Sequence, residues 1–368
     1  MSATSSSSVA AVMAAFGEPL AIYEIQVSPP MPREVVIRTR ASGICHSDRS
    51  AQMGLSARAP RPPIVLGHEV SGVVERVGAG VTAARVGDNV VACAAASCGA
   101  CSWCRRGKEE LCTSTRRIRD VGDPPRLSQG GEPVGAFVGI GGFASHVLVH
   151  EQAVVPIPSS MALDRAAILA CAVHTGIGAV RHSADVKRGD RVVVIGCGGV
   201  GLNVVQGARL SGARAIVGVD LQPGNLQMAK VMGATNTFDA ANADLIQAVV
   251  DATDGGADHV FDVVGRESTL VQALAMTRPG GTVTMVGLPD PGSRVSVSGE
   301  DLFAEKKLQG HKMGRGFRDD IVWYCRLYSS GDLFLDELIA GSVSLDGVNE
   351  ALSSMNGATG RTLIAFEA

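Results

Sequence analysis

The sequence predicts an α/β protein in which a doubly wound parallel sheet is joined to a β-rich domain. Residues 191–195 form a short apolar run that ends in a glycine-rich turn at 196–201. From there to about residue 312, strand-length apolar runs alternate with stretches of helical periodicity, which is typical of a parallel sheet covered by helices. Before the turn, residues 9–40 hold strand-like runs separated by Gly and Pro turns. A chain of 368 residues has room for about two such domains.

The composition excludes several classes of protein. Apolar residues make up 46% of the chain and the formal net charge is -3. The chain therefore lacks the excess of basic residues that would indicate a nucleic-acid partner. No apolar run approaches the roughly 20 residues that a membrane-spanning helix needs. The apolar stretch 9–16 is short and has no basic flank, so we interpret it as a first strand and not as a signal peptide.

The glycine-rich turn predicts a dinucleotide site. Gly196, Gly198 and Gly201 have the G-x-G-x-x-G spacing, and the residues between them include Gly199 and Val200. Such a turn brings backbone N–H groups and a helix N-terminus to a pyrophosphate. Asp220 ends the next apolar run, where an acid bonds a ribose 2′-hydroxyl and repels a 2′-phosphate, which favours NAD. The alternative is an ordinary strand–turn–helix followed by a chance acid.

Further β-α units follow the turn, and their strand ends predict more of the same site. Because ligands bind at the carboxyl ends of parallel strands, we expect Val264 and Val286 to lie near the cofactor. The expected helices and strands of this region and of the C-terminal segment are helices 202–210, 225–232, 245–252, 268–276, 301–307, 319–328, 333–340 and 345–355, and strands 191–195, 215–219, 236–239, 259–264, 282–286, 308–312 and 361–366.

Four cysteines on one short loop predict a structural zinc site. Cys98, Cys101, Cys104 and Cys112 have the spacing C-x2-C-x2-C-x7-C. Four thiolates suit tetrahedral zinc, and a closed set of four leaves no position for chemistry. An iron–sulfur cluster also takes four thiolates, although its usual spacings differ. A nucleic-acid zinc module is a third interpretation, but one basic loop in a net-acidic chain is more typical of a solvated face.

Three further residues predict a catalytic zinc site. Cys45, His68 and Cys171 form a Cys₂His set, which leaves one position open for substrate or water. Asp48 or Glu69 could orient His68. Taken one at a time, these residues are more typical of a buried small cysteine and a surface turn histidine, but together with the cysteine loop they favour a metal site. The nine cysteines are odd in number and clustered, which argues for metal binding in a reducing compartment, so we expect a cytoplasmic protein.

Together these motifs resemble the zinc-containing medium-chain alcohol dehydrogenases. The run Gly67-His68-Glu69, with Gly72, Gly78 and Val81 after it, resembles the family's zinc signature, and the cysteine loop resembles its structural zinc lobe. The resemblance implies a GroES-like β domain from residues 1–171 and 314–368, and a Rossmann NAD-binding domain from residues 172–313. The segment after Cys112 resembles the long-lobed dimeric branch, which includes thiol-dependent formaldehyde dehydrogenases, and so implies a homodimer.

The resemblance also implies a role for individual residues. It implies that Cys45, His68 and Cys171 are the catalytic zinc ligands. It also implies that Glu69 lies behind the metal and that Asp48 forms a hydrogen bond with His68. It makes Ser47 the hydroxyl that passes on the substrate proton. The implied cofactor contacts are Thr175 and Val200 beside the nicotinamide, Asp220 on the adenosine ribose, and His46 and Arg361 on the pyrophosphate.

Four positions bear on substrate and cofactor binding. Ser50 stands where the family's proton relay often ends in a histidine, and Asn225 stands where a basic residue often follows the ribose acid. Ala94 stands where an aromatic usually narrows the pocket, which predicts a wider pocket and a bulkier alcohol. Arg116 resembles the arginine that binds anionic substrates in the thiol-dependent branch, or is a solvated lobe arginine.

The leading hypothesis is an NAD-dependent zinc alcohol dehydrogenase that acts on bulky, aromatic or long-chain primary alcohols and their aldehydes. The first alternative is oxidation of a thiol–aldehyde adduct, which Arg116 favours. The second is a zinc-stabilised NAD(H)-binding protein without turnover.

Overall fold

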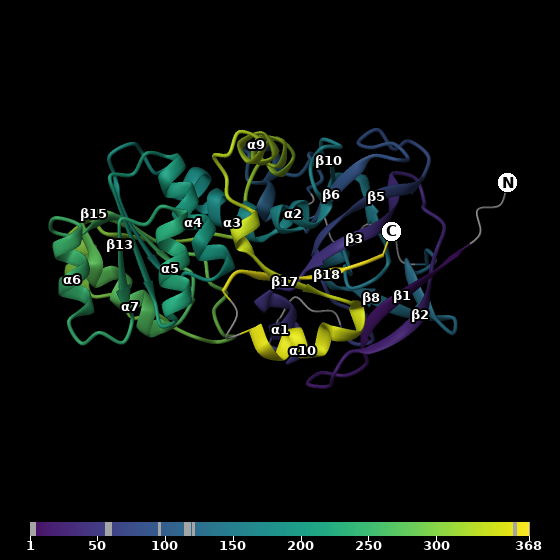
Figure 1. Cartoon of the computed structure of the whole chain (residues 1–368), viewed down its shortest axis with the longest axis horizontal. Coiled ribbons are helices and arrows are strands. Elements are labelled where there is room, and N and C mark those ends of the chain that lie inside the picture. Colours follow the sequence, from purple (N-terminus) through teal and green to yellow (C-terminus); the bar gives the residue numbers. More distant parts are fainter. Residues whose placement is uncertain are drawn as a thin grey trace. The chain divides into compact units, whose positions relative to one another are not determined.

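The computed structural model describes residues 5–55, 61–94, 97–113, 119, 122–355 and 359–367. The chain divides into two compact units (Figure 1). Unit 1 comprises Met1–Cys171, Arg315–Ser329 and Ile339–Ala368. Unit 2 comprises Ala172–Gly314 and Ser330–Leu338.

Unit 2 contains one parallel sheet in the order β13-β12-β11-β14-β15-β16. Its strands are β11 (Arg191–Ile195), β12 (Ala215–Asp220), β13 (Asn236–Asp239), β14 (Ala257–Asp262), β15 (Thr277–Met285) and β16 (Lys307–Gly310). The strand order reverses between β11 and β14, the point at which a doubly wound sheet binds a dinucleotide. The predicted α/β fold class is confirmed.

Helices cover both faces of this sheet because the strand order runs outward from β11 in two opposite directions, and crossovers of the usual right-handed kind then place their helices on opposite faces. They are α3 (Ala172–Gly178), α4 (Gly199–Leu210), α5 (Pro223–Met232), α6 (Leu245–Ala252), α7 (Glu267–Met276) and α8 (Gly299–Phe303). Alternate strand residues such as Val193, Val217 and Val260 share one buried cluster with Val249 of α6 and Leu274 of α7. Figure 1 shows α4 and α5 on the side of the sheet away from α6 and α7.

Unit 1 is β-rich and is built from a closed barrel and a second sheet. The barrel strands are β1 (Ser6–Met13), β2 (Ala21–Val27), β7 (Leu127–Gln129), β8 (Glu132–Ala136) and β4 (Ile64–Val65). The second sheet comprises β10 (Val154–Pro156), β6 (Asn89–Cys93), β5 (Glu69–Val77), β3 (Glu34–Gly43), β18 (Arg361–Ala365) and β17 (Ile339–Val343), with β9 (His146–His150) paired to β3. Val36 of β3 enters the barrel core, whereas Val35 and Ile37 enter a second core, because successive strand residues face opposite sides.

Unit 1 also has four α-helices in its described part: α1 (His46–Gln52), α2 (Leu163–Ala167), α9 (Phe317–Ser329) and α10 (Val348–Ser354). Helix α1 was not expected from the sequence. It begins because Asp48, its third residue, accepts the backbone N–H of Cys45 at 2.9 Å, which caps the first turn.

The segment after α9 differs from its prediction in two ways. The helix expected over residues 333–340 is wrong, because only a 3₁₀ turn at Asp336–Leu338 forms before β17 begins. The domain boundary also differs, since Ser330–Leu338 belongs to unit 2. Phe334 exchanges two hydrogen bonds with the side chain of Gln206, and Arg209 lies over the Phe334 ring. These contacts attach the segment to α4.

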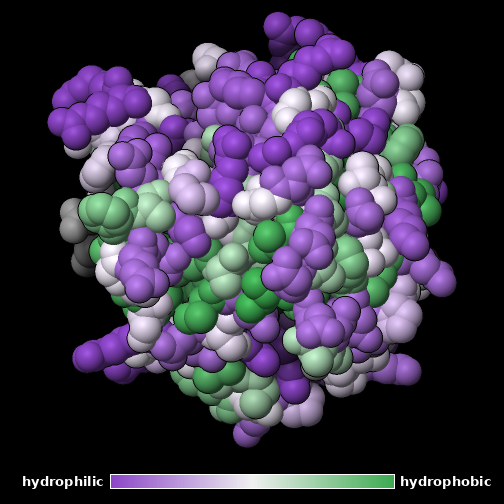
Figure 2. Space-filling model, turned by 90° about the vertical axis from the view of Figure 1, so that its left-hand side faces the viewer, coloured by the Kyte–Doolittle hydropathy of each residue, from purple (hydrophilic) through white to green (hydrophobic). Residues whose placement is uncertain are grey.

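The surface of the described residues is mixed in polarity. On the face that Figure 2 shows, polar side chains surround a smaller group of apolar ones. No single described helix is long and apolar enough to cross a membrane, although one bent pair, Leu163–Ala170 with Ala172–Ala184, meets that test by length and composition.

Candidate metal centre and cofactor-binding turn

One buried carboxylate joins the two segments that carry the first predicted metal ligands. Asp48 accepts the N–H of Cys45 at 2.9 Å through Oδ2 and the N–H of Gly67 at 3.0 Å through Oδ1. Its Oδ1 also lies 3.1 Å from Nδ1 of His68. Gly67 has φ 87°, and a Cβ there would lie 2.7 Å from the backbone N of Phe143, so this approach requires glycine. The expected bond between Asp48 and His68 is present.

The structure gathers Cys45, His68, Glu69 and Cys171 into one cluster. Their candidate ligand atoms all lie within 4.8 Å of one another. Cys45, His68 and Glu69 are buried and Cys171 is half-buried. Two thiolates and an imidazole suit zinc and leave one position open. The donor set therefore fits a catalytic zinc ion.

Glu69 is paired with Arg361 within this cluster. Nη2 of Arg361 lies 3.0 Å from Oε1 of Glu69, and Nη1 donates a hydrogen bond to the carbonyl of Ile44 at 3.3 Å. Both side chains are buried, and burial raises the pKa of Glu69 to about 7 even though the Arg361 guanidinium acts to lower it. The expected contact of Arg361 with the pyrophosphate stays a prediction.

The protonation of the ligands follows from their neighbours. Hydrogen bonding with Cys171 and the charge of Arg361 hold the pKa of Cys45 well below its ordinary value, although burial acts to raise it. Burial acts to lower the pKa of His68, but the Asp48 carboxylate outweighs it and raises that pKa. The thiolate form, which is the form that binds metal, is therefore favoured at Cys45.

Ser47 lies at the edge of the same cluster. Its Oγ is 3.6 Å from the Sγ of Cys45, and its side chain is half-buried. His46, its neighbour in α1, is exposed, and its expected contact with the pyrophosphate stays a prediction. Ser50 lies on the same helix, half-buried.

The four lobe cysteines form a second cluster. The Sγ–Sγ distances are 3.5 Å for Cys101–Cys104 and 3.9 Å for both Cys98–Cys104 and Cys101–Cys112. A Zn–S bond of about 2.3 Å places tetrahedral sulfurs about 3.8 Å apart. None of the nine cysteines, all of which the structure describes, forms a disulfide. The spacing of the sulfurs therefore fits a tetrahedral metal site.

The three motif glycines of the turn have different surroundings. Gly196 has φ 90°, and a Cβ at Gly201 would lie 1.8 Å from the carbonyl oxygen of Gly196. These two glycines therefore shape the turn and let α4 begin close to β11. A Cβ at Gly198 would meet no described atom within 4 Å, so the backbone there is open to a ligand. Gly199 is the first residue of α4.

Asp220 lies at the carboxyl end of β12, beside the turn. Its Oδ2 accepts the N–H of Cys197 at 2.7 Å, and its Oδ1 accepts the N–H of Gln222 at 2.8 Å. The carboxylate is therefore held by backbone donors on both sides. Carboxylate oxygens have more than one lone pair, so a ribose hydroxyl can still donate to it.

Unit 2 brings the other predicted cofactor residues to the same edge of the sheet. A Cβ at Gly176 would lie 2.5 Å from the carbonyl oxygen of Val200, so Thr175 and the start of α4 are close together. A Cβ at Gly196 would lie 2.9 Å from Cγ2 of Val264. The Rossmann turn, Thr175, Val200 and Val264 therefore surround one corner, which fits a bound dinucleotide.

Sequence reasoning missed Asp262, which organises the next strand end. Its buried carboxylate accepts the N–H groups of Val264 at 3.0 Å and Gly265 at 3.2 Å. Its backbone carbonyl accepts the N–H groups of Val286 and Gly287 at 2.8 and 3.0 Å. One residue thus sets the backbone of two predicted cofactor segments. The only signal in the sequence is an acid at the end of an apolar strand.

Of the two residues predicted to contact the substrate, the structure describes only Ala94. Ala94 follows β6 directly, is half-buried and packs against the second core of unit 1. Arg116 lies outside the described residues.

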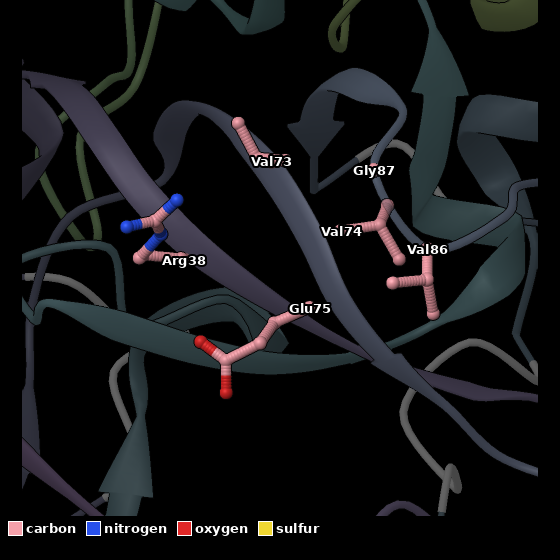
Figure 3. A pocket seen from close by; sticks show the side chains of 6 residues that line it. All are labelled: Arg38, Val73, Val74, Glu75, Val86 and Gly87. Carbon is pink, nitrogen blue, oxygen red and sulfur yellow. The ribbon is translucent and has the colours of Figure 1, made fainter. Parts of the chain in front are cut away.

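Unit 1 also has a cavity of about 290 Å³ (Figure 3). It is lined by Arg38, Val73, Val74, Glu75, Val86 and Gly87. None of these residues belongs to a metal cluster, and Glu75 is already paired with His146 at 3.0 Å. We therefore assign this cavity no part in the reaction.

Comparison with known sequences places both units in one family. Residues 31–159 match the alcohol dehydrogenase GroES-like domain, and residues 199–330 match the zinc-binding dehydrogenase domain. A class-3 alcohol dehydrogenase from Oryza sativa subsp. japonica is 34% identical over 357 residues, which cover 94% of this chain and 93% of that protein. An S-(hydroxymethyl)glutathione dehydrogenase from Escherichia coli is 34% identical over 369 residues, covering 97% of this chain and 99% of that protein.

Solved structures agree with the sequence comparison. A benzyl alcohol dehydrogenase from Acinetobacter calcoaceticus superposes with a TM-score of 0.92 at 28% identity, covering 98% of this chain and all of that one (100%). An acetophenone reductase from Geotrichum candidum, solved in complex with NAD, gives a TM-score of 0.79 at 26% identity, covering 98% and 97%. The chain therefore belongs to the zinc-containing alcohol dehydrogenases, a family of NAD-dependent oxidoreductases with a GroES-like and a Rossmann domain.

Proposed function

We propose that the chain transfers a hydride between a bulky primary alcohol, aromatic or long-chain, and NAD, and catalyses the reverse reduction of the aldehyde. The observation that carries this proposal is the cluster of Cys45, His68 and Cys171 with the Ser47 hydroxyl 3.6 Å from the Cys45 sulfur. It combines an open metal site with a group that can move a proton.

The residues of this cluster would hold the metal and direct the proton. Bound zinc supplies Lewis-acid polarisation of the substrate oxygen, and bound NAD supplies the hydride acceptor. Ser47 accepts the proton of the substrate hydroxyl at Oγ and releases its own to the next group. Asp48 holds His68 in one orientation through Nδ1, which leaves Nε2 for the metal. Arg361 balances the charge of Glu69 beside the ligands.

The cysteine lobe has a different role in this proposal. Cys98, Cys101, Cys104 and Cys112 would hold a second zinc ion with all four positions filled by protein. By holding this ion with four thiolates, the cysteines would stabilise the lobe and would leave no position for a substrate. Unit 2 would hold NAD at the glycine turn, with Asp220 on the adenosine ribose and Thr175 and Val200 beside the nicotinamide. The contacts of His46 and Arg361 with the pyrophosphate stay predictions from the family resemblance.

Two observations support a bulky alcohol as substrate. Ala94 offers only a methyl group where an aromatic side chain would narrow the pocket. The structural neighbour with a TM-score of 0.92 is named a benzyl alcohol dehydrogenase. A cytoplasmic homodimer stays our expectation from the family resemblance.

A second candidate function is oxidation of a thiol–aldehyde adduct. The curated relatives from Escherichia coli are named S-(hydroxymethyl)glutathione dehydrogenase. Their likeness covers nearly the whole chain at 34% identity.

Initial rates of NAD reduction separate the two candidates. We would assay ethanol, octanol and benzyl alcohol, and formaldehyde with and without glutathione. The leading proposal expects kcat/KM to rise with the size of the alcohol and no need for a thiol. Turnover only with formaldehyde and glutathione together would replace it with the second candidate. NADH binding without turnover on any substrate would contradict both.

The variant Ala94→Phe tests the substrate assignment directly. A phenyl ring at this position should lower kcat/KM for benzyl alcohol by about tenfold or more and leave ethanol within about threefold, because steric selection by one pocket residue is commonly worth 1–3 kcal/mol. Ala94→Val is the matched control, because valine adds less volume than phenylalanine at the same position. Equal losses on ethanol and benzyl alcohol would show that Ala94 does not select by size.

A further inference from the structure

An ion pair connects the cysteine lobe to the segment in which the chain returns to unit 1. Nε of Arg315 donates a hydrogen bond to Oε1 of Glu110 at 2.9 Å. The Glu110 side chain is only 7% exposed, and it belongs to the 3₁₀ turn Glu109–Leu111, which directly precedes Cys112. Because burying a carboxylate is costly unless a cation compensates its charge, this pair holds Arg315 against the lobe.

The residue before Arg315 packs closely against a helix of unit 2. A Cβ at Gly314 would lie 2.3 Å from Cε1 of His174, and a Cβ at Gly178 would lie 2.8 Å from Cα of Gly314. His174 and Gly178 are four residues apart in α3, so they share one face of that helix. Gly314 therefore lies against this face, so closely that a methyl group would displace the buried His174 ring.

The same helix carries a residue of the proposed cofactor site. Thr175 directly follows His174, and the proposed function places it beside the nicotinamide. About half a turn away, a Cβ at Gly176 would lie 2.5 Å from the carbonyl oxygen of Val200, so α3 also packs against the start of α4. A shift of Gly314 would therefore move His174, and Thr175 with it, because a close-packed interior transmits small displacements.

One peptide bond joins the two contacts. Glu110 and Arg315 belong to unit 1, whereas Gly314 and His174 belong to unit 2. Consecutive Cα atoms are held about 3.8 Å apart, so fixing Arg315 limits the positions that Gly314 can take. The contacts thus run without a break from the cysteine lobe to the residue that precedes Thr175.

We propose that Arg315 is a positioning residue for the nicotinamide end of the cofactor site. Its ion pair with Glu110 uses the four-cysteine lobe as an anchor and holds Gly314 against His174. This inference rests on the proposed place of Thr175 beside the nicotinamide. It gives the lobe a part in cofactor binding besides the stability of its own fold.

Two ligands separate positioning from general stability. NADH carries the nicotinamide, whereas ADP-ribose has the same adenosine and pyrophosphate without it. We expect Arg315→Gln to raise the Kd for NADH about three- to tenfold, since residues that act on a site through their neighbours commonly have effects of this size. The Kd for ADP-ribose should stay within about twofold of the wild-type value. Isothermal titration calorimetry of the zinc-loaded protein measures both constants.

Matched variants show whether the ion pair itself is responsible. Arg315→Lys should restore the wild-type Kd for NADH, because the pair is a single contact that an ammonium group can also make. Glu110→Gln should reproduce Arg315→Gln, and the double variant should lose little more, because both changes remove the same pair. Arg278→Gln is the control, since it removes the pair with the buried Asp258 at the amino ends of β14 and β15 and should leave both constants unchanged.

The outcomes distinguish this inference from the proposed function. Failure of the wild-type protein to bind NADH would overturn the proposed NAD site, and the inference with it. Wild-type binding with an unchanged Kd for NADH in Arg315→Gln would overturn only the inference. Equal losses of affinity for NADH and ADP-ribose, or loss of zinc from the lobe, would also overturn it, because such a result shows a general structural role. Should Arg315→Gln not fold, Glu110→Gln, which keeps the shape of the side chain, provides the same comparison.

Discussion

At the scale of single residues, Asp48 shows how one side chain prepares a metal site. It binds two backbone N–H groups and one imidazole, and these belong to the segments that carry Cys45 and His68. A carboxylate can serve all three because it only accepts hydrogen bonds. An amide of the same shape cannot.

We expect Asp48→Asn to lose metal and activity together. Its NH₂ group would face a backbone N–H, so His68 and Cys45 would lose a common anchor. Loss of a residue that orients a metal ligand typically costs 10–100-fold in affinity or activity. The measurements are zinc per chain and kcat, with Asp319→Asn, an exposed acid of α9, as the control. Unchanged zinc content and kcat would contradict this role.

The cysteines outside the clusters should be chemically inert. Cys93, Cys197 and Cys325 are buried, and burial raises the pKa of Cys197 to about 12 and that of Cys325 to about 11. Because only the thiolate reacts, we expect iodoacetamide at pH 8 to leave all three unmodified in the zinc-loaded protein. Mass spectrometry of digested protein checks this, and chelation should expose only the cluster cysteines. Labelling of Cys197 in folded protein would contradict the expectation.

At the scale of elements, the turn between β11 and α4 separates shape from binding. Gly201 is required by packing, because its Cβ would overlap the carbonyl of Gly196. Gly198 has an extended backbone and open space beside it. A side chain at Gly201 should therefore affect folding, whereas a side chain at Gly198 should affect the affinity for the ligand.

We expect Gly198→Ala to keep the Tm of the wild type and to raise the Kd for NADH at least about tenfold, because an added methyl keeps the pyrophosphate from the backbone. Gly201→Ala should lower the Tm itself. Gly299→Ala is the control, since a Cβ there also meets no described atom and Gly299 belongs to α8, not to the turn. A wild-type Kd for NADH in Gly198→Ala would contradict the assignment of the cofactor site to this turn.

At the scale of the whole molecule, a buried ion network ties together three segments of unit 1. Glu34, at the start of β3, accepts from Nη2 of Arg119 at 2.6 Å, Nε of Arg126 at 2.9 Å and the N–H of Met31 at 2.9 Å. Burial acts to raise the pKa of Glu34, but the two arginines outweigh it, so that pKa is held below 4.5. An acid whose pKa is lowered by folding stabilises the folded state above its unfolded pKa and loses this effect as pH falls.

We therefore expect Glu34→Gln to destabilise the protein at pH 7 by about 3–5 kcal/mol, because two buried arginines lose their counterion. The difference from wild type should begin to shrink as pH falls below about 4.5, where Glu34 of the unfolded chain takes up a proton, and should be lost as pH falls through the lower pKa of the native carboxylate. Urea unfolding at pH 7 and at pH 3.5 measures both. Glu132→Gln, an exposed acid of β8, should change little at either pH. A pH-independent difference would contradict the ionic explanation.

Local patterns were enough to predict much of this molecule. The glycine turn, the β-α alternation and the cysteine spacing each depend on residues a few positions apart, and the parallel sheet and the four-cysteine cluster lie where these patterns indicated. The spacing of apolar residues indicates whether a segment is a helix or a strand, because each element buries one of its faces.

Contacts between distant segments decided the rest. Ser330–Leu338 joins unit 2 because Gln206, more than a hundred residues earlier in the chain, binds Phe334. The pairing of Arg361 with Glu69 and that of Arg315 with Glu110 are likewise properties of packing. No local pattern encodes these features, since hydrogen bonds and burial depend on which remote side chains meet, and only the folded chain brings them together.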